Sequence, residues 1–327
     1  MIVVLGLGGS NHDFSSCIVK DGIILSMIED ERITRNKYGI GLGIELGKGY
    51  SRKYCLNEAN VTLEEVDLIV ANDIISKLMY SRMKKEVVLI NHHLSHIASA
   101  FYPSEFQEAA ILVVDSVGSK IEGKRGDQYE SISFANGKGN KIEILDKQYG
   151  YNLSGTDYVE NSLGIFYSII TQIIGFNEHE EGKTMGLAPY GTDTYYQMLK
   201  KHIRFIGDGK IEMTSDDINE LLGYRDFINS HLDEDKKNSV RADFAYACQC
   251  ILEEAMLYLV RHLYKLTKCD NLCITGGVGL NSVANYKIYK QGPFKNIFIQ
   301  PAAGDNGTGI GSALYGYYGI LNNKRII

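Results

Sequence analysis

Two histidines stand four residues apart in the segment NHHLSHIA, which covers residues 91 to 98. At that spacing in a helix, His92 and His96 project from one face into the same space. Neutral imidazole is the commonest protein ligand for metals such as zinc and iron. A half-buried, hydrogen-bonded structural pair has the same spacing, so the pair alone supports either interpretation.

A third ligand has to come from elsewhere, and the best candidate is Asp305 in the segment PAAGDNGTGIG. Glycines on both sides of this carboxylate leave the backbone room to bend around an ion. Two histidines and one carboxylate, with further positions open, suit a divalent iron or zinc centre. The sequence therefore predicts a metal site that joins distant parts of the chain.

Composition and charge narrow the class of protein. The 327 residues are 44% hydrophobic and 23% charged, which is typical of a soluble globular protein long enough for two lobes. An apolar run of about 18 residues and a secretory signal are both missing from the sequence, so we expect no membrane span and a cytoplasmic location. The net charge of −6 argues against a nucleic-acid-binding surface. The six cysteines form no Cys-x-x-Cys pair and are expected to be reduced, mostly buried thiols.

One pattern of strands and turns occurs twice along the chain. Residues 2–8 form an apolar run that ends in glycine, and two strand-like segments follow, SSCIVKD and GIILSMIED. Residues 110–145 repeat this order with AILVVDSVGS, a glycine- and charge-rich turn, YESISFANG and KIEILDK. We expect an α/β fold of two lobes with a cleft between the copies. The first lobe is residues 1–109, to which a C-terminal helix at 306–327 returns, and the second is 110–305.

The chain is predicted to turn helical after the second copy. Apolar residues spaced three and four apart predict helices over 159–174, 193–205 and 240–267. The last helix leads into a strand, NLCITGG, and then into another helix within VGLNSVANYKIYK. A strand, a Gly-Gly turn and a helix N-terminus can offer backbone amides to an anion or a nucleotide, although the same glycines can serve close packing alone. The polar segment 229–239 is the best predicted surface loop.

Six separate segments together resemble the carbamoyltransferases of the NodU/CmcH type. They are NHHLSHIASAFYPS, VVDSVGS, NSLGIFYSIITQIIGF, EEGKTMGLAPYG, CITGGVGLNSVANYKI and PAAGDNGTGIGSAL. The resemblance runs from near residue 4 to the C-terminus and concerns the transferase domain of that family. It implies an actin-like, sugar-kinase and chaperone ATPase fold, with two lobes that each contain a duplicated α/β core. It also implies a relationship to the transferase that makes threonylcarbamoyladenosine in tRNA.

The reaction that this resemblance implies is transfer of a carbamoyl group from carbamoyladenylate, an ATP-derived nucleotide, to a hydroxyl group of a natural product or sugar. In the family a His-x-x-x-His pair and a late Asp hold a metal, commonly iron, which orients the phosphate of the donor. These positions match His92, His96 and Asp305. Fe²⁺ is the expected ion, and Zn²⁺ uses the same ligands. The identity of the acceptor, and whether its oxygen or nitrogen is carbamoylated, stay open.

Three further residues receive catalytic roles from the resemblance. His12, in GSNHDFSS, matches the family's Gly-His-Asp turn and is the expected general base, a role that suits an ordinary pKa of about 6.5. The alternative is that His12 only hydrogen-bonds its own turn. Lys37 and Lys183 fall where the family places basic residues near the donor, and an ammonium group there could balance the oxyanion that forms during transfer. Each lysine could instead be a surface salt-bridge partner.

The residues matched to nucleotide binding follow the predicted strands. Asp115 occupies the second phosphate-turn position, or is only the cap of that turn. The adenosine-side loop of the family matches Gly276, Gly277, Gly279 and Asn281. Gly304, which precedes the expected metal ligand, completes the predicted cofactor-binding set. The sequence departs from the family pattern at residues 115–119, DSVGS, where Asp is usually followed by glycine and the segment ends in an acidic residue.

Family members usually carry a second domain, similar to threonylcarbamoyl-AMP synthase, that makes carbamoyladenylate from ATP and carbamoyl phosphate. We expect no such C-terminal domain in these 327 residues. A separate protein then supplies the adenylate, another donor is used, or the ancestral activity has been lost.

Three hypotheses follow for the function of the chain. The first is a metal-dependent O-carbamoyltransferase in natural product biosynthesis, with a small-molecule acceptor and a separate carbamoyladenylate-forming partner. The second is a non-catalytic, nucleotide-binding scaffold subunit. The third is an enzyme like the tRNA threonylcarbamoyl transferase, against which the missing basic surface counts. A homo-oligomer is compatible with all three.

Overall fold

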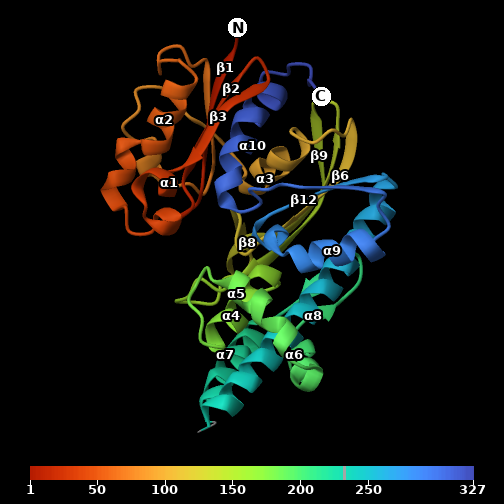
Figure 1. Ribbon diagram of the computed structural model, residues 1–327. Helices are drawn as coiled ribbons and strands as arrows, with labels where there is room; N and C mark the ends of the chain where they lie inside the picture. The colour runs from red at the N-terminus through yellow and green to blue at the C-terminus, as the bar shows by residue number, and fades with distance from the viewer. Residues whose placement is uncertain (231–232) are drawn as a thin grey trace.

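The computed structural model describes residues 1–230 and 233–327. Two mixed β-sheets lie on either side of a layer of two helices, α3 (His92–Phe101) and α10 (Thr308–Tyr315). A group of longer helices extends away from the second sheet (Figure 1). The chain begins in the first sheet, and α10 near the C-terminus packs back against it.

The first sheet has the strand order β3-β2-β1-β4-β5. Its strands are β1 (Val3–Gly8), β2 (Ser15–Lys20), β3 (Ile23–Glu29), β4 (Leu68–Asn72) and β5 (Val88–Ile90). Strand β1 is antiparallel to β2 and parallel to β4. Alternate residues of β1 enter different cores: Val4 faces the helix layer, whereas Leu5 faces the opposite side. The strands predicted between residues 2 and 30 are confirmed.

Short helices cover the side of the first sheet that Leu5 faces. They are α1 (Asp30–Thr34), α2 (Tyr50–Glu58) and the 3₁₀ segments η1 (Lys37–Gly39), η2 (Gly43–Lys48) and η3 (Lys77–Met79). Buried Phe14 and Met79 belong to the core beneath them. This side of the molecule therefore has a core of its own, separate from the one that contains α3 and α10.

The second sheet repeats the order of the first. Its strands are β6 (Glu108–Val114), β7 (Lys120–Gly123), β8 (Gly126–Lys138), β9 (Lys141–Tyr151), β12 (Asn271–Thr275) and β13 (Asn296–Ile299). Pairing runs β13-β12-β6-β8, with β9 and β7 both against β8, and β6 is parallel to β12 and antiparallel to β8. The predicted duplication is confirmed, but the turn predicted between the first two strands of this copy contains β7. The division into lobes 1–109 and 110–305 stays a prediction.

The helix layer is held together by unusually close backbone contacts. A Cβ atom on Gly311 of α10 would lie 1.7 Å from the carbonyl oxygen of Ser95 in α3, and one on Gly6 of β1 would lie 2.1 Å from the carbonyl oxygen of Gly309. Real Cβ atoms cannot approach so closely, so only glycine allows α10 to pack against both α3 and β1.

The helical region lies between β9 and β12 in sequence. Its helices are α4 (Leu163–Ile173), α5 (Glu181–Leu187), α6 (Tyr196–Lys200), α7 (Ser215–Asn229) and α8 (Glu234–Thr267), with 3₁₀ segments η4 (Ala188–Tyr190) and η5 (Asp193–Tyr195) and strands β10 (Arg204–Phe205) and β11 (Ile211–Glu212). The remaining segments are η6 (Gly277–Leu280), α9 (Ser282–Gln291), η7 (Asp305–Gly307) and the π-helical η8 (Gly316–Ile320). The predicted helices at 159–174 and 240–267 are confirmed as α4 and α8.

Two predictions in this region were wrong. The segment 193–205 is not one helix, because α6 has only five residues and the chain then enters β10. The segment 229–239 is mostly not a loop, because Asp233 caps α8 by accepting the Asp235 backbone N–H at 2.9 Å, and the helix continues from Glu234. Residues 231 and 232 of that segment lie outside the described residues.

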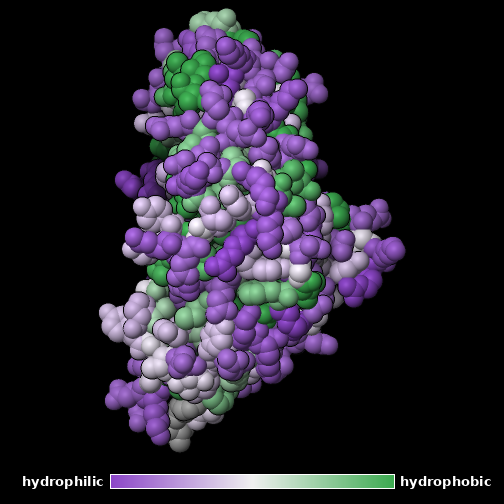
Figure 2. All heavy atoms as spheres, turned by 90° about the vertical axis from the view of Figure 1, so that its right-hand side faces the viewer, coloured by the Kyte–Doolittle hydropathy of each residue, from purple (hydrophilic) through white to green (hydrophobic). Residues whose placement is uncertain are grey.

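The six cysteines are free thiols, four buried and two partly buried, which confirms their predicted state. Figure 2 shows a mostly hydrophilic face with hydrophobic residues in separate patches. In the described parts of the chain, the helices are all too short or too polar to cross a membrane.

The contact between α3 and α10 can be tested by adding one methyl group. Gly311→Ala is expected to destabilise the protein by about 3 kcal/mol, because the backbone of α3 cannot move aside without repacking the core. Urea denaturation followed by circular dichroism measures the change. The matched control is Gly182→Ala in α5, where the added Cβ would meet nothing within 4 Å and stability should be unchanged or slightly higher. Equal stability of both variants would contradict the close packing.

Candidate metal centre

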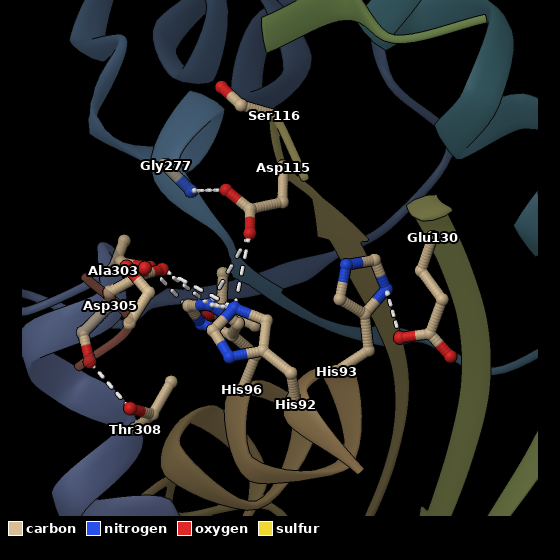
Figure 3. Close-up of polar contacts among 12 residues, drawn as sticks. His92, His93, His96, Asp115, Ser116, Glu130, Gly277, Ala303, Asp305 and Thr308 are labelled. Carbon is tan, nitrogen blue, oxygen red and sulfur yellow. Dashed lines mark hydrogen bonds and ion pairs between the residues drawn. The ribbon is translucent and has the colours of Figure 1, made fainter. Parts of the chain in front are cut away.

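Four side chains converge between the two sheets: His92, His96, Asp115 and Asp305 (Figure 3). Each offers one nitrogen or oxygen atom, and these four atoms all lie within 4.8 Å of one another. All four residues are buried. We refer to them below as the ligand cluster.

The members of the ligand cluster come from three places in the fold. His92 and His96 lie on the first turns of α3, where Asn91 caps the helix by accepting the Leu94 backbone N–H at 3.0 Å. Asp115 directly follows β6, and Asp305 begins η7. The structure thus brings the histidine pair together with Asp305, as expected. Asp115 is the fourth member of the cluster and its second carboxylate.

The separations in the cluster fit a metal ion. His92 Nε2 lies 3.3 Å from Asp305 Oδ1 and 3.3 Å from Asp115 Oδ2, and it lies 3.1 Å from His96 Nε2. His96 Nε2 lies 3.4 Å from Asp305 Oδ1. Ligand atoms bound tetrahedrally at about 2.1 Å from an ion would be ~3.4 Å apart. Imidazole and carboxylate together are the donor set of zinc and non-haem iron sites, so the residues present fit either ion.

Charge also favours a cation at this position. Burial alone would lower the pKa of His92, but the carboxylates of Asp305 and Asp115 outweigh it and raise that pKa to about 10. Burial alone would raise the pKa values of the two aspartates, but the neighbouring histidines hold the pKa of Asp305 well below its usual range and lower that of Asp115. Two buried carboxylates need a compensating positive charge, which either a proton on His92 or a divalent ion can supply.

A second layer of polar residues fixes the start of α3. Asn91 Nδ2 donates to Glu130 Oε1 at 2.8 Å, and Lys147 Nζ donates to Asn91 Oδ1 at 2.9 Å while also pairing closely with Glu130. The His92 backbone N–H donates to Ser119 Oγ at 2.8 Å and lies 3.1 Å from Asp73 Oδ1. Ser119 ends the segment that departs from the family pattern, and here its hydroxyl helps to hold the histidine pair.

His93, between the two candidate ligands, points away from them. Its Nδ1 lies 2.7 Å from Ser133 Oγ and 3.8 Å from Glu130 Oε2, and Figure 3 shows the ring turned toward Glu130. Burial holds the pKa of His93 well below its ordinary value. The ring is therefore neutral and belongs to the packing of α3 against β8.

His12 lies beside the ligand cluster on the turn between β1 and β2. Its Nδ1 lies 3.1 Å from Asp13 Oδ2, and its ring is partly exposed. The turn is tied to Asp305, because the Gly9 N–H donates to Thr308 Oγ1 at 3.0 Å and Thr308 Oγ1 donates to the Asp305 carbonyl at 2.5 Å. Burial alone would lower the pKa of His12, but Asp13 and, after it, Asp305 outweigh burial and raise that pKa.

The glycines predicted to bind the nucleotide lie against Asp115. The Gly277 N–H donates to Asp115 Oδ1 at 3.1 Å, and Gly276 has a left-handed φ of 89°. A Cβ on Gly276 would lie 2.3 Å from the Val114 carbonyl oxygen, so this turn must be glycine to reach the end of β6.

The other nucleotide-site candidates have clear structural partners. Gly279 packs near Ala303, where an added Cβ would be 3.3 Å away. Asn281 caps α9 and exchanges two amide hydrogen bonds with Gln249, at 2.8 and 3.0 Å. Gly304 precedes Asp305 and is the N-cap residue of η7. These contacts place the predicted loop next to the ligand cluster while giving Asn281 a role in packing.

Lys37 and Lys183 are not brought to the ligand cluster. Lys183 is 56% exposed and pairs with Glu180 at 2.5 Å, and Lys37 lies 4.7 Å above the ring of Tyr38. In the part of the chain that the structure describes, neither ammonium group contacts a member of the cluster. Both are surface residues, and the ion pair between Lys183 and Glu180 is the kind of contact that the alternative salt-bridge interpretation describes.

Comparison with known proteins identifies the family. A family model described as Carbamoyltransferase N-terminus matches residues 75–314, which is well over half of the chain. The chain belongs to the carbamoyltransferase family. This confirms the resemblance seen in the sequence, and the match includes all four members of the ligand cluster.

Individual relatives agree with this assignment. The chain is 30% identical to Uncharacterized protein sll1178 of Synechocystis, covering 100% of this chain and 59% of that protein. It is 27% identical to Nodulation protein NolNO of Sinorhizobium fredii, covering 93% of this chain and 46% of that protein. The chain thus spans about half the length of these two relatives.

Solved structures confirm the fold. Full-length HypF, in its phosphate- and nucleotide-bound form, matches with a TM-score of 0.62 at 13% identity, covering 98% of this chain and 56% of HypF. This identity is low, so the likeness concerns the fold alone. The chain has the actin-like fold that the family resemblance implied, with the duplicated sheets that the sequence predicted.

The ligand cluster predicts a specific pattern of metal loss. His92→Ala combined with His96→Ala is expected to lower the affinity for Zn²⁺ or Fe²⁺ at least about tenfold, because half of the donor atoms are removed. Asp115→Asn should also weaken binding if Asp115 is a ligand. Metal content after dialysis, measured by mass spectrometry, gives the result. His12→Asn is the matched control and should keep the metal. Full retention of metal by the double variant would reject the assignment.

Metal binding is also expected to release a proton. A pKa of about 10 keeps His92 protonated near neutral pH, and an ion can bind only the neutral ring. Affinity should therefore rise with pH, roughly tenfold per unit below that pKa, and Zn²⁺ should displace about one proton at pH 7.5. Calorimetry in buffers of different ionisation enthalpy counts the proton. Binding without proton release would show that His92 is already neutral.

Proposed function

We propose that the chain is the transferase part of a metal-dependent O-carbamoyltransferase, which moves a carbamoyl group from carbamoyladenylate to a hydroxyl of a natural product or sugar. The observation that carries this proposal is the convergence of the ligand cluster, from α3, β6 and η7, with His12 beside it. Family membership supplies the reaction class. A divalent ion, Fe²⁺ or Zn²⁺, held by the cluster would supply positive charge to the donor's phosphate.

His12 is the proposed general base. The acceptor oxygen attacks the carbamoyl carbon, the bond from that carbon to the phosphate oxygen breaks, and AMP leaves with the bonding electrons. The hydroxyl proton passes to His12 Nε2, because Nδ1 faces Asp13 at 3.1 Å. A carboxylate at Nδ1 fixes the imidazole tautomer and stabilises the imidazolium that forms, as in other acid–base sites.

The donor nucleotide is proposed to lie along the glycine turn after β12. Gly276 and Gly277 bring the backbone to the edge of the ligand cluster, where the Gly277 N–H donates to Asp115, and a turn of glycines without Cβ atoms lets a phosphate approach the backbone closely. HypF, a protein of this fold whose solved structure is in a phosphate- and nucleotide-bound form, supports the placement. Lys37 and Lys183, on the two surface segments beside His12, are proposed to meet the donor at the rim of the site and to balance negative charge there.

The source of the donor is proposed to lie outside the 327 residues. The relatives are about twice as long as the matched region, so a separate protein or domain can make carbamoyladenylate from carbamoyl phosphate and ATP. Supplying the adenylate directly separates transfer from donor synthesis.

The decisive experiment follows carbamoyladenylate and a panel of polyhydroxylated acceptors by mass spectrometry. The metal-loaded protein is expected to consume the adenylate and to form a product heavier by one carbamoyl group. His12→Asn should keep nucleotide affinity and metal while slowing transfer by about 10²-fold or more, which is typical for loss of a general base. Adenylate that is never consumed would favour the scaffold hypothesis instead.

The pH profile gives an independent check on His12. A base must be neutral, so the rate should rise with pH through the pKa of His12. Without an ion in the cluster, burial lowers that pKa, but Asp13 and Asp305 outweigh burial and raise it. The pairing with Asp13 remains when an ion occupies the cluster, and this part of the shift should persist. The same acid limb in His12→Asn would assign the base elsewhere.

A further inference from the structure

Tyr38 and His179 meet next to His12, although 141 positions separate them in the sequence. Tyr38 Oη donates to the His179 carbonyl oxygen at 2.7 Å, and the two rings lie 5.0 Å apart between centroids. The His179 ring also packs on the His12 ring, with centroids 4.5 Å apart and planes tilted by 59°. The rings of Tyr38, His179 and the candidate base His12 therefore form one cluster.

This contact joins two different cores. Gly39, next to Tyr38, packs on Phe14 in the core of the first sheet, whereas Phe176, near His179, packs on the core that contains α4 and α8. Among the described residues, the bond from Tyr38 to His179 is the one hydrogen bond found between residues 1–90 and residues 152–268. The contact between Tyr38 and His179 therefore links the first-sheet side of the molecule to the helical region.

The backbone at both ends of the bond is held in an unusual conformation. Tyr38 has φ 59° and ψ 0°, and His179 has φ 63°, in the left-handed region that side chains with a Cβ seldom adopt. Tyr38 is not one of the residue types, such as Gly, Asn, Asp and His, that take this conformation more readily. Strained residues that meet one another beside a reactive side chain are typical of functional sites.

The turn that holds His12 is fixed by the same segment. The Asp13 N–H donates to the Tyr38 carbonyl at 2.7 Å, so Tyr38 binds the His12 turn through its backbone and His179 through its hydroxyl. His12 is then bounded by Asp13 at Nδ1 and by the His179 ring on one side. With these contacts made, the orientation of the imidazole is restricted.

We propose that His179 is a positioning residue, which reaches from the α4–α5 connection to hold the His12 imidazole in the orientation that receives the acceptor proton. This inference rests on the proposed function for the role of His12. His179 acts through its ring and does not touch the ligand cluster. Tyr38 anchors it, so the site is complete only when the first-sheet side and the helical region are in contact.

Kinetics test the role with matched variants. His179→Ala is expected to lower kcat about tenfold while metal content, nucleotide affinity and acceptor KM stay within twofold, because only the orientation of the base is lost. His179→Phe keeps an aromatic ring against His12 and should restore most of kcat. The control is Glu178→Ala, an exposed neighbour on the same connection, which should match the wild type. An unchanged kcat in His179→Ala would overturn the proposal.

A second readout does not depend on carbamoyl transfer. The chain contains no tryptophan, so His179→Trp introduces the single indole of the protein against His12, and its emission can be excited apart from that of the 22 tyrosines. Imidazole quenches indole, and the emission should rise about twofold when His12→Phe is added in the same background. Equal emission would show that the two side chains are not in contact in solution and would overturn the proposal. If the contact is seen but wild-type protein never transfers a carbamoyl group, the proposed function fails instead.

Discussion

Two carboxylates buried against two imidazoles are the constraint on which the rest of the structure depends. Asp115 and Asp305 cannot stay ionised in an apolar interior unless positive charge is fixed between them. The fold brings the two imidazoles to the two carboxylates because β6 ends, and α3 and η7 begin, at the same point. The polar residues around Asn91 and Ser119 then satisfy the backbone of α3, so the histidines cannot turn away.

The duplicated sheets explain why such a point exists. Strands β1 and β6 hold equivalent places in the two copies, and each ends in a turn that faces the space between them. His12 follows β1, and Asp115 follows β6. Parallel neighbours β4 and β12 end at the same edges as β1 and β6, which brings the glycine turn after β12 beside Asp115.

Much of the site could be predicted from the sequence because its signals are local. Helical spacing identified His92 and His96, and flanking glycines identified Asp305. Asp115 was assigned to a phosphate turn, because the sequence shows that a turn follows the strand but not which way the carboxylate points. The hydroxyl of Ser119 was missed for the same reason: a hydrogen bond to the backbone of another element leaves no pattern in its own segment.

The fold could be predicted where the pattern of apolar residues was strong. The prediction failed where polar segments form a strand or a helix. Alternating apolar residues revealed both copies of the sheet, whereas β7 is a short, exposed edge strand without such alternation. The segment after Asp233 is rich in Glu and Lys, which are good helix formers, but its charge suggested a loop. Lys37 shows a different limit of the sequence. Family resemblance matched its position along the chain, but it does not reveal where the ammonium group of an exposed side chain lies.

Gly311 limits how this protein could diversify. The backbones of α3 and α10 touch at this glycine. A larger side chain there, or a shift of either helix by one turn, would therefore displace His92 and His96. Substitutions are therefore easier to accommodate in the peripheral connections than in this central pair of helices.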